Sequence, residues 1–385
     1  MKIIIKACVI FSIFMLIAAE GIEKNPQWKG TIEEKDGVKV IKNPNEPLYG
    51  EIEFELEEDL SIGNEEDENY LFYKARSLQV DNKGMIYVLE SGNSRIQKFD
   101  HYGNYVQTIG RQGQGPGEFT MPSNLQIDIE TGHIYVNDFM KLEIFDSEGK
   151  HLQKIKLTTP FPNILVNEDE ESVWLMLPSF NQTDFGQIKY SFCKLNYEGK
   201  ILNNMGSFSY LFTPTNMART SKQSGEVSVL ITGYEHQLHF TKIDNNTIIH
   251  GYSDKYELNL IDNDGNCKFR IQRKTPIQHF TKNEKKKYEG VNLPDYKPFF
   301  HHIFTDSKDR IYVQRSLRKL SKKFSRSFDI YSKQGYFLHK ASLPYSPHVI
   351  KDGYLYTLIS FEDTGEEYIK RYKIKNWEQI KTGIN

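Results

Sequence analysis

Short apolar segments separated by turn signals repeat along most of this chain. Residues 81–103 (DNKGMIYVLESGNSRIQKFDHYG) and 128–149 (DIETGHIYVNDFMKLEIFDSEG) each hold a turn running from Asp to Gly, an apolar segment, a polar loop, a second apolar segment and another such turn. Asp at the start of a type I turn and Gly at its end is a favoured combination. The segments IYVLE and IYVND carry bulky residues at successive positions, which is typical of strands packed on both faces. The pattern therefore predicts repeated β-hairpins rather than helices.

The repeat predicts an all-β fold, a six-bladed β-propeller of four-stranded antiparallel blades. A sequence period of about 40–50 residues with four strands per repeat is typical of propeller blades. Weaker copies of the second half of the repeat end at Gly199, Gly265 and Gly335, and copies of its first half occupy 306–313 and 351–358. The six predicted blades lie near residues 72–109, 120–157, 161–205, 233–271, 301–341 and 346–376.

One strand precedes the first complete blade. The segment GEIEFELEEDLSIG (50–63) resembles the end of a repeat, so we expect strand 51–57 to supply the outer strand of the last blade and to close the ring, which removes free sheet edges. The predicted organisation is a signal peptide at 1–19, an N-terminal lead segment at 20–47, the propeller at 48–376 and a C-terminal tail at 377–385.

The glycine-rich stretch GRQGQGPGEF (110–119) raises the question of a phosphate-binding loop. A P-loop needs GxxxxGK[ST] leading into a helix, whereas this stretch has no such Lys and leads into a strand. Its spacing also differs from the G-x-G-x-x-G of dinucleotide-binding folds. The stretch is better explained as a tight crossing between two blades, where glycine supplies a positive φ.

GRQGQGPGEF followed by a strand, with NSRIQKFDHYG upstream, resembles the NHL-repeat class of six-bladed β-propellers. More narrowly, it is similar to the secreted or lipoprotein six-bladed β-propeller proteins of gut and environmental bacteria. The resemblance covers about residues 50–376 and is strongest in the first two blades. The wider class includes binding modules and some metal-dependent lyases and lactonases, so the resemblance leaves both possibilities open.

The N-terminus and the charge balance bear on location and partners. Lys2 and Lys6 precede the apolar run ACVIFSIFMLIAA (7–19), which is too short for a bilayer span and reads as a cleavable signal peptide. We therefore expect a secreted, periplasmic or cell-envelope protein with no stable membrane span after cleavage. Glu20 and Gly21 follow the run where a lipoprotein would have Cys. The net charge of −2 gives no indication of nucleic-acid binding.

Candidate site residues lie on the side of the ring that carries the long connections, because propeller ligands bind around the mouth of the central channel. The candidates at this mouth are Arg76, Arg95, Arg111, Asn124, Asp138 and His302. An Arg here could grip a carboxylate or sulfate, or bridge neighbouring blades. The run RSLRKLSKKFSR (Arg315–Arg326) reads as a solvated loop or as an anion-binding patch.

Histidines recur near the starts of the inner strands. His236 or His239, His301 or His302, and His348 would approach the channel, and converging imidazoles can bind a transition metal. No spacing motif fixes them, so we predict no cofactor and retain His236, His302 and His348 as weak metal candidates. Adjacent His301 and His302 point to opposite faces of a strand, so at most one lines the channel.

These observations predict a propeller that binds a ligand or protein without catalysis of its own. The expected partner is a glycan, a peptide or a cell-envelope protein, and the aromatic segments 210–212 and 296–300 suit sugar stacking, protein contact or packing within their own insertions. The alternative is a metal-dependent hydrolase or lyase of the lactonase or amidating-lyase type. That alternative needs Glu, Asp, Asn or His side chains converging in the channel. Ligand identity, oligomeric state and the roles of insertions 206–236 and 272–300 are not determined by the sequence.

Overall fold

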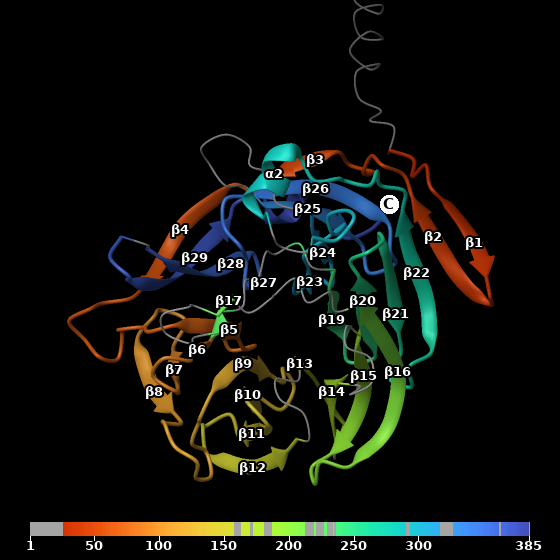
Figure 1. The fold of residues 1–385 in the computed structure, drawn as a ribbon. Coiled ribbons are helices and arrows are strands. Elements are labelled where there is room, and N and C mark those ends of the chain that lie inside the picture. The colour runs from red at the N-terminus through yellow and green to blue at the C-terminus, as the bar shows by residue number, and fades with distance from the viewer. Residues whose placement is uncertain are drawn as a thin grey trace, which may run out of the picture.

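The structure is a computed structural model in which six β-sheets are arranged around a ring (Figure 1). It describes residues 26–157, 163–169, 172–180, 187–211, 219–220, 227–228, 234, 236–289, 293–315, 326–361 and 363–384. The predicted signal peptide lies outside these residues. Within them, no helix combines the length and the apolar character needed to cross a bilayer.

Each sheet of the ring is one blade, and the predicted six-bladed all-β fold is confirmed. Blade I consists of β5 (Ala75–Val80), β6 (Ile86–Glu90), β7 (Arg95–Phe99) and β8 (Tyr105–Ile109). Blade II consists of β9 (Pro122–Ile127), β10 (Ile134–Asp138), β11 (Lys141–Phe145) and β12 (His151–Lys156). Blade III consists of β13 (Asn163–Asp169), β14 (Ser172–Phe180), β15 (Gln187–Asn196) and β16 (Ile201–Leu211).

The remaining blades follow the same antiparallel order. Blade IV holds β19 (Leu238–Asp244), β20 (Thr247–Tyr252), β21 (Glu257–Ile261) and β22 (Cys267–Arg273). Blade V holds β23 (His302–Thr305), β24 (Ile311–Gln314), β25 (Arg326–Tyr331) and β26 (Phe337–Leu343). Blade VI holds β27 (Val349–Lys351), β28 (Tyr354–Ser360) and β29 (Glu367–Ile374), and its fourth strand comes from the N-terminal part of the chain. A separate short pair, β17 (Arg219–Thr220) and β18 (Val227–Ser228), lies in the insertion before blade IV.

The ring is closed by an N-terminal strand, as expected, but with different bounds. The closing strand is β4 (Leu56–Ile62), which pairs antiparallel with β29, rather than residues 51–57. β3 (Glu51–Glu53) instead adds a fifth strand to blade V by pairing parallel with β26. The chain thus contributes to two neighbouring blades before the repeat begins.

Segments predicted to lie outside the propeller also pack on it. The hairpin of β1 (Thr31–Lys35) and β2 (Val38–Asn43) extends blade IV, because β2 pairs parallel with β22. A short 3-10 helix, η1 (Trp377–Gln379), follows the last blade, and its Trp377 is buried in the hydrophobic core formed by blades V and VI.

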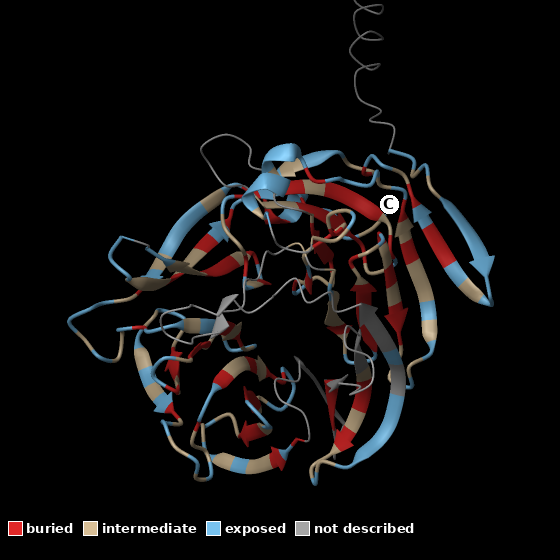
Figure 2. Ribbon diagram, viewed as in Figure 1, coloured by how far each residue is buried: buried red, intermediate tan, exposed pale blue. Residues whose placement is uncertain are grey.

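The middle strands of the blades are packed on both faces. Every residue of β6 and of β10 is buried, including the polar residues at their ends (Figure 2). The outer strand β8 instead alternates between exposed and half-buried positions. The unbroken apolar runs in the sequence thus correspond to strands whose two faces are covered by the neighbouring blades.

Asp-to-Gly turns join the third and fourth strands as predicted. Asp100 Oδ1 accepts hydrogen bonds from the N–H groups of Tyr102 at 2.9 Å and Asn104 at 2.8 Å, and Gly103 has a φ of 86°. The turns between the first and second strands lie on the same face of the ring, here called the turn face. The opposite face, here called the loop face, carries the connections between blades and between second and third strands.

A capping box begins the short helix within insertion 272–300. Helix α2 (Lys282–Lys287) begins after Thr281, whose side chain accepts from the Glu284 N–H while the Glu284 carboxylate accepts from the Thr281 N–H. Lys297 donates to Glu284 at 2.6 Å, which ties the helix to the segment before blade V. The helix has no buried residues, so this ion pair helps to fix it in place.

Candidate functional site

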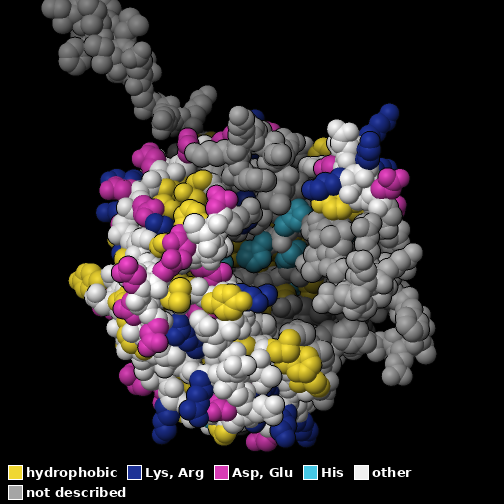
Figure 3. Space-filling view, turned by 60° about the vertical axis from the view of Figure 1, so that its left-hand side comes forward, with side chains coloured by type: hydrophobic (Ala, Val, Ile, Leu, Met, Phe, Trp, Pro, Cys, Tyr) yellow, Lys and Arg dark blue, Asp and Glu magenta, His cyan; other side chains and the backbone are white. Residues whose placement is uncertain are grey.

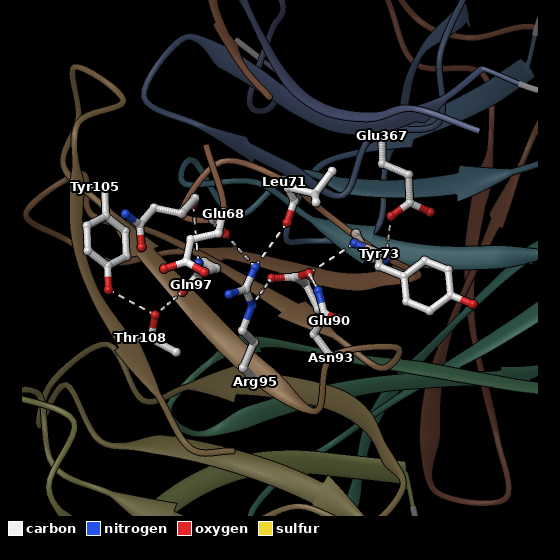
Figure 4. A network of polar contacts seen from close by, with 12 residues as sticks. Glu68, Leu71, Tyr73, Glu90, Asn93, Arg95, Gln97, Tyr105, Thr108 and Glu367 are labelled. Carbon is white, nitrogen blue, oxygen red and sulfur yellow. Dashed lines mark hydrogen bonds and ion pairs between the residues drawn. The ribbon is translucent and has the colours of Figure 1, made fainter. Parts of the chain in front are cut away.

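Arg95, a predicted ligand contact, is held in an ion pair on the loop face. Its Nε donates at 2.8 Å to Glu90, which is fully buried, and its guanidinium also donates to the carbonyls of Glu68 and Leu71 at 2.9 and 3.0 Å (Figure 4). The other Glu90 oxygen accepts from the Tyr73 N–H at 3.0 Å and from the Asn93 amide at 2.7 Å. The pair therefore fixes the connection that leads from the closing strand into blade I.

Asp138 has the same structural role in blade II as Glu90 has in blade I. It is fully buried at the end of β10, and it accepts from the N–H groups of Thr120, at 2.8 Å, and of Met121. Lys141 lies 3.0 Å from it at the start of β11. Asp138 thus holds the blade-to-blade connection, and its carboxylate faces protein partners instead of the channel.

Arg111 also belongs to a local structure, within the glycine-rich crossing. Its Nε donates to Glu118 at 2.8 Å, and Glu118 accepts from the Gly115 N–H at 2.9 Å. Gly110 and Gly117 have φ of 74° and 72°, so the stretch uses glycine for its backbone shape, as expected for a crossing between blades. The Gly113 and Gly115 N–H groups already have protein acceptors, which agrees with the reading that excludes a phosphate loop.

Two other predicted residues lie on the inner strands. Asn124 on β9 accepts from the Ser77 hydroxyl of β5 at 3.2 Å and so bridges blades I and II. Arg76 on β5 is exposed, and its Nε donates to Ser91 at 3.0 Å. The side chain of Asn163, at the start of the inner strand of blade III, is outside what the structure describes.

Three histidines from three blades gather at the loop-face end of the inner strands. His239 lies near the start of β19, His302 opens β23, and His348 directly precedes β27. The space-filling view shows histidine side chains together in a hollow of the molecule (Figure 3). Protein surrounds all three, yet His302 and His348 remain open to solvent, as expected for side chains lining a concave site.

Their surroundings keep these imidazoles neutral. Burial lowers the pKa of His239 to about 3, with further lowering from His302 and His301. The pKa of His348 falls to about 4, first through burial and then through His302 and Arg326. Burial and Arg326 also lower the pKa of His302. These three histidines at the inner-strand starts, together with Arg326, which opens β25 in the same blade as His302, are here called the channel cluster.

His236 is not part of the channel cluster. Its Nε2 lies 3.1 Å from the Tyr296 carbonyl, and its ring lies 4.9 Å from the Tyr296 ring. It therefore helps to pack the insertion that precedes blade V. The half-buried His301 bonds through its backbone N–H to the Gln314 carbonyl at 2.9 Å, while its neighbour His302 is exposed.

Arg326 is the functional candidate that sequence reasoning did not single out. It is the last residue of the basic run Arg315–Arg326 and the first residue of β25. It is half-buried, and burial lowers its pKa. Within the described residues no carboxylate pairs with it. The one available signal was the basic run, for which an anion-binding patch was one of the two readings.

An arginine occupies the position in blade V where blades I and II have a buried acid. Glu90 and Asp138 each lie two residues after a mid-strand Val, and the equivalent residue after Val313 is Arg315. The acid of blade V stands on the third strand instead, as buried Asp329, which faces Val313 across the sheet and binds Arg315 at 3.0 Å. Arg315 faces Ser327 in the register, so Ser327 holds the position of Arg95 and Lys141, and Arg326 lies one residue before it.

Six exposed apolar side chains lie on the loop face and are here called the apolar rim. They come from the blade-to-blade connections and from the second-to-third-strand loops of blades VI, I and II. These residues are Leu71, Tyr73, Met121, Phe139, Met140 and Phe361, each between 38% and 53% exposed. Phe139 holds a φ of 54° in a two-residue turn, where Asn or Gly is the usual choice. A non-glycine residue in this backbone conformation is energetically costly.

The described residues provide no metal centre. No three His, Cys, Asp or Glu side chains among them are arranged to hold a metal ion. Glu90 and Asp138, acids near the channel mouth, are committed to cations and backbone N–H groups of the protein. The convergent acids that a metal-dependent hydrolase or lyase requires are therefore not found in this part of the chain.

Comparison with known proteins agrees on the fold. Residues 65–248 match a family model described as a 6-bladed beta-propeller, and the chain is a six-bladed β-propeller. No curated protein matches the chain. The NHL-repeat resemblance stays a prediction.

Solved structures with low sequence identity share this architecture. A member of the DUF4221 family from Bacteroides vulgatus is 14% identical, with a TM-score of 0.53, and the match covers 83% of this chain and 98% of that one. A predicted exported protein from Bacteroides fragilis is 12% identical, with a TM-score of 0.50 and coverage of 87% and 99%. Identities this low show a common fold and carry no activity from one protein to the other.

Proposed function

We propose that this chain is an exported, non-catalytic β-propeller that binds a peptide segment on its loop face. One observation carries the proposal: the apolar rim lies on the same face as the channel cluster, while the polar groups of blades I and II are already bonded within the protein. Ligand sites in propellers form where loops surround the channel mouth. A predicted signal peptide supports export.

The composition of the apolar rim favours a peptide over a glycan. Sugar sites place free hydrogen-bond donors and acceptors around an aromatic platform, so that hydroxyl groups find partners. On the rim, the carboxylates nearest Tyr73 and Met121 accept from the N–H groups of those same residues. Adaptable Met side chains beside aromatic ones suit apolar peptide side chains.

The test is a binding measurement with a random octapeptide library and an array of neutral oligosaccharides, both presented to the full-length chain. Peptide binding that weakens at least tenfold in Phe139→Asn supports the proposal. Asn accepts the left-handed backbone at this turn, so this variant should fold as well as the natural protein.

The matched control is Tyr102→Ser, because Tyr102 is 71% exposed on the turn face. This control should bind like the unaltered chain. Binding of oligosaccharides without peptides, or equal loss in both variants, contradicts the proposal.

A further inference from the structure

We propose that the channel cluster binds a carboxylate of the peptide ligand, with Arg326 as the charged contact and His302 and His348 as neutral hydrogen-bonding partners. The inference rests on the proposed peptide-binding function and adds the chemical group that the channel recognises. It assigns a role to Arg326, whose charge the described residues leave without a partner.

The first argument is the energetic cost of a half-buried Arg326 guanidinium without a counter-ion. Half-buried Arg326 has a lowered pKa through burial, and the charged neighbours that the structure gives it are positive or potentially positive. A charge that loses its water is costly unless it is paired. Arg95 in blade I and Arg315 in blade V both have buried acids. Arg326 has no such acid among the described residues, so an anionic ligand would stabilise it.

The second argument is the chemistry of the surrounding imidazoles. Neutral histidine offers one N–H donor and one acceptor nitrogen. His348 Nδ1 faces the Leu358 N–H at 3.3 Å, which leaves the Nε2–H as the donor of the neutral ring. A planar guanidinium binds a carboxylate through paired N–H groups, and nearby imidazole N–H groups can complete the shell of an anion.

The third argument connects the channel cluster to the apolar rim. A strand of blade VI supplies the loop with Phe361 of the rim, and the same blade starts directly after His348 of the cluster. The apolar rim and the channel cluster thus lie on the same face of blade VI, so one peptide could contact both. Either a C-terminal carboxylate or an Asp or Glu side chain would supply the group that Arg326 needs.

The experiment uses three small probes on the full-length chain: N-acetyl-phenylalanine, its uncharged amide and glucuronate. Affinity and histidine side-chain resonances are measured together by NMR titration. We expect at least tenfold preference for N-acetyl-phenylalanine over the amide, with shifts of the His239, His302 and His348 signals. Acetyl-aspartyl-phenylalaninamide then tells side-chain carboxylate recognition from C-terminal recognition.

Variants locate the contact. Arg326→Gln should lower the affinity for N-acetyl-phenylalanine at least tenfold, and His302→Gln should lower it severalfold. Arg76→Gln is the matched control, since it removes one positive charge from an exposed inner-strand residue bonded to Ser91, and it should change affinity less than twofold.

The outcomes separate the two proposals. Equal binding of acid and amide, unchanged in Arg326→Gln, overturns the carboxylate inference and leaves the peptide-binding function in place. Glucuronate binding that depends on Arg326, without binding of either phenylalanine probe, overturns the peptide function while the carboxylate site stands. A loss in Arg76→Gln equal to that in Arg326→Gln shows a general charge effect and overturns the assignment.

Discussion

Blades I and II differ from blade V in what the start of their third strand contacts at the channel mouth. Arg95 and Lys141 each open a third strand and each meet a buried acid at the end of the second strand. In blade V the equivalent position is Ser327, and Arg326 opens the strand one residue earlier, where no acid among the described residues pairs with it. The start of the third strand thus stabilises a connection in blades I and II, whereas in blade V it carries the cation that we propose binds a ligand.

The largest effect expected from this comparison follows Glu90→Gln. The change leaves Arg95, whose side chain is 19% exposed, without a counter-ion and weakens the acceptor of the Tyr73 N–H. Breaking a buried ion pair from one side should lower the free energy of unfolding by about 3 kcal/mol. Urea unfolding measures this loss, and a loss below about 1 kcal/mol would remove the structural role assigned to this pair.

A smaller loss is expected for Asp138→Asn. The Thr120 and Met121 N–H groups bond to different carboxylate oxygens, so the amide oxygen keeps one of these bonds, and the charge that faces Lys141 is lost. Lys141 also contacts Glu143 at 2.8 Å, so one counter-ion remains. We expect the free energy of unfolding to fall by about 1–2 kcal/mol, measured as for Glu90→Gln. A larger loss than for Glu90→Gln would show that the second counter-ion contributes little.

The pH dependence of stability distinguishes the core histidines from those of the channel cluster. Burial lowers the pKa of the core histidines His250 and His339 to about 4, below the value near 6.5 of the unfolded chain. The unfolded state therefore binds more protons between these values, so stability falls as pH drops from about 6.5 toward 4. His339→Gln should reduce the slope of unfolding free energy against pH by up to one proton. An unchanged slope would contradict the lowered pKa.

Channel histidines should respond to a ligand, unlike those of the core. A bound carboxylate favours the protonated imidazole, so it should raise the pKa of His348 from about 4 while those of His250 and His339 stay near 4. Carboxylate affinity should then rise as pH falls from 7 to 5. The groups that face His348 are His302 and Arg326, and neither loses positive charge as pH falls. NMR titration of the histidine signals follows both sets at once. Equal upward pKa shifts in the core and channel histidines would show that the carboxylate does not bind at the channel cluster.

The smallest effect belongs to the glycine-rich crossing. Glu118→Gln removes the ion pair with Arg111, whose side chain is 81% exposed. The Gly115 N–H keeps an acceptor in the amide oxygen. Exposed ion pairs contribute about 0.5 kcal/mol or less, so unfolding should change within that limit. A loss comparable to that of Asp138→Asn would mean that the crossing supports the ring more than its exposure indicates.

The repeat made the blades predictable because turn chemistry and buried strands recur in sequence. The closing strand was placed about five residues early, since 50–63 contains two short strands that join different blades. The hairpin Thr31–Asn43 was not predicted, because every residue of TIEEK is exposed and the segment carries no apolar period.

The site was less predictable than the fold. A sequence shows that Arg95, Arg111 and Asp138 lie near the mouth, but it does not show which acid or N–H each one meets. The histidines His302 and His348 were found because they start inner strands. Arg326 was overlooked because the basic run does not show which of its residues begins the third strand of blade V.

The most direct test compares Arg95→Gln with Arg326→Gln for both unfolding free energy and affinity for N-acetyl-phenylalanine. We predict opposite outcomes: Arg95→Gln loses about 2 kcal/mol of stability and keeps its affinity, whereas Arg326→Gln changes stability by less than about 0.5 kcal/mol and loses at least tenfold in affinity. Destabilisation of Arg326→Gln to the level of Arg95→Gln, with affinity unchanged, would contradict the difference between the structural cations of blades I and II and the ligand-binding cation of blade V.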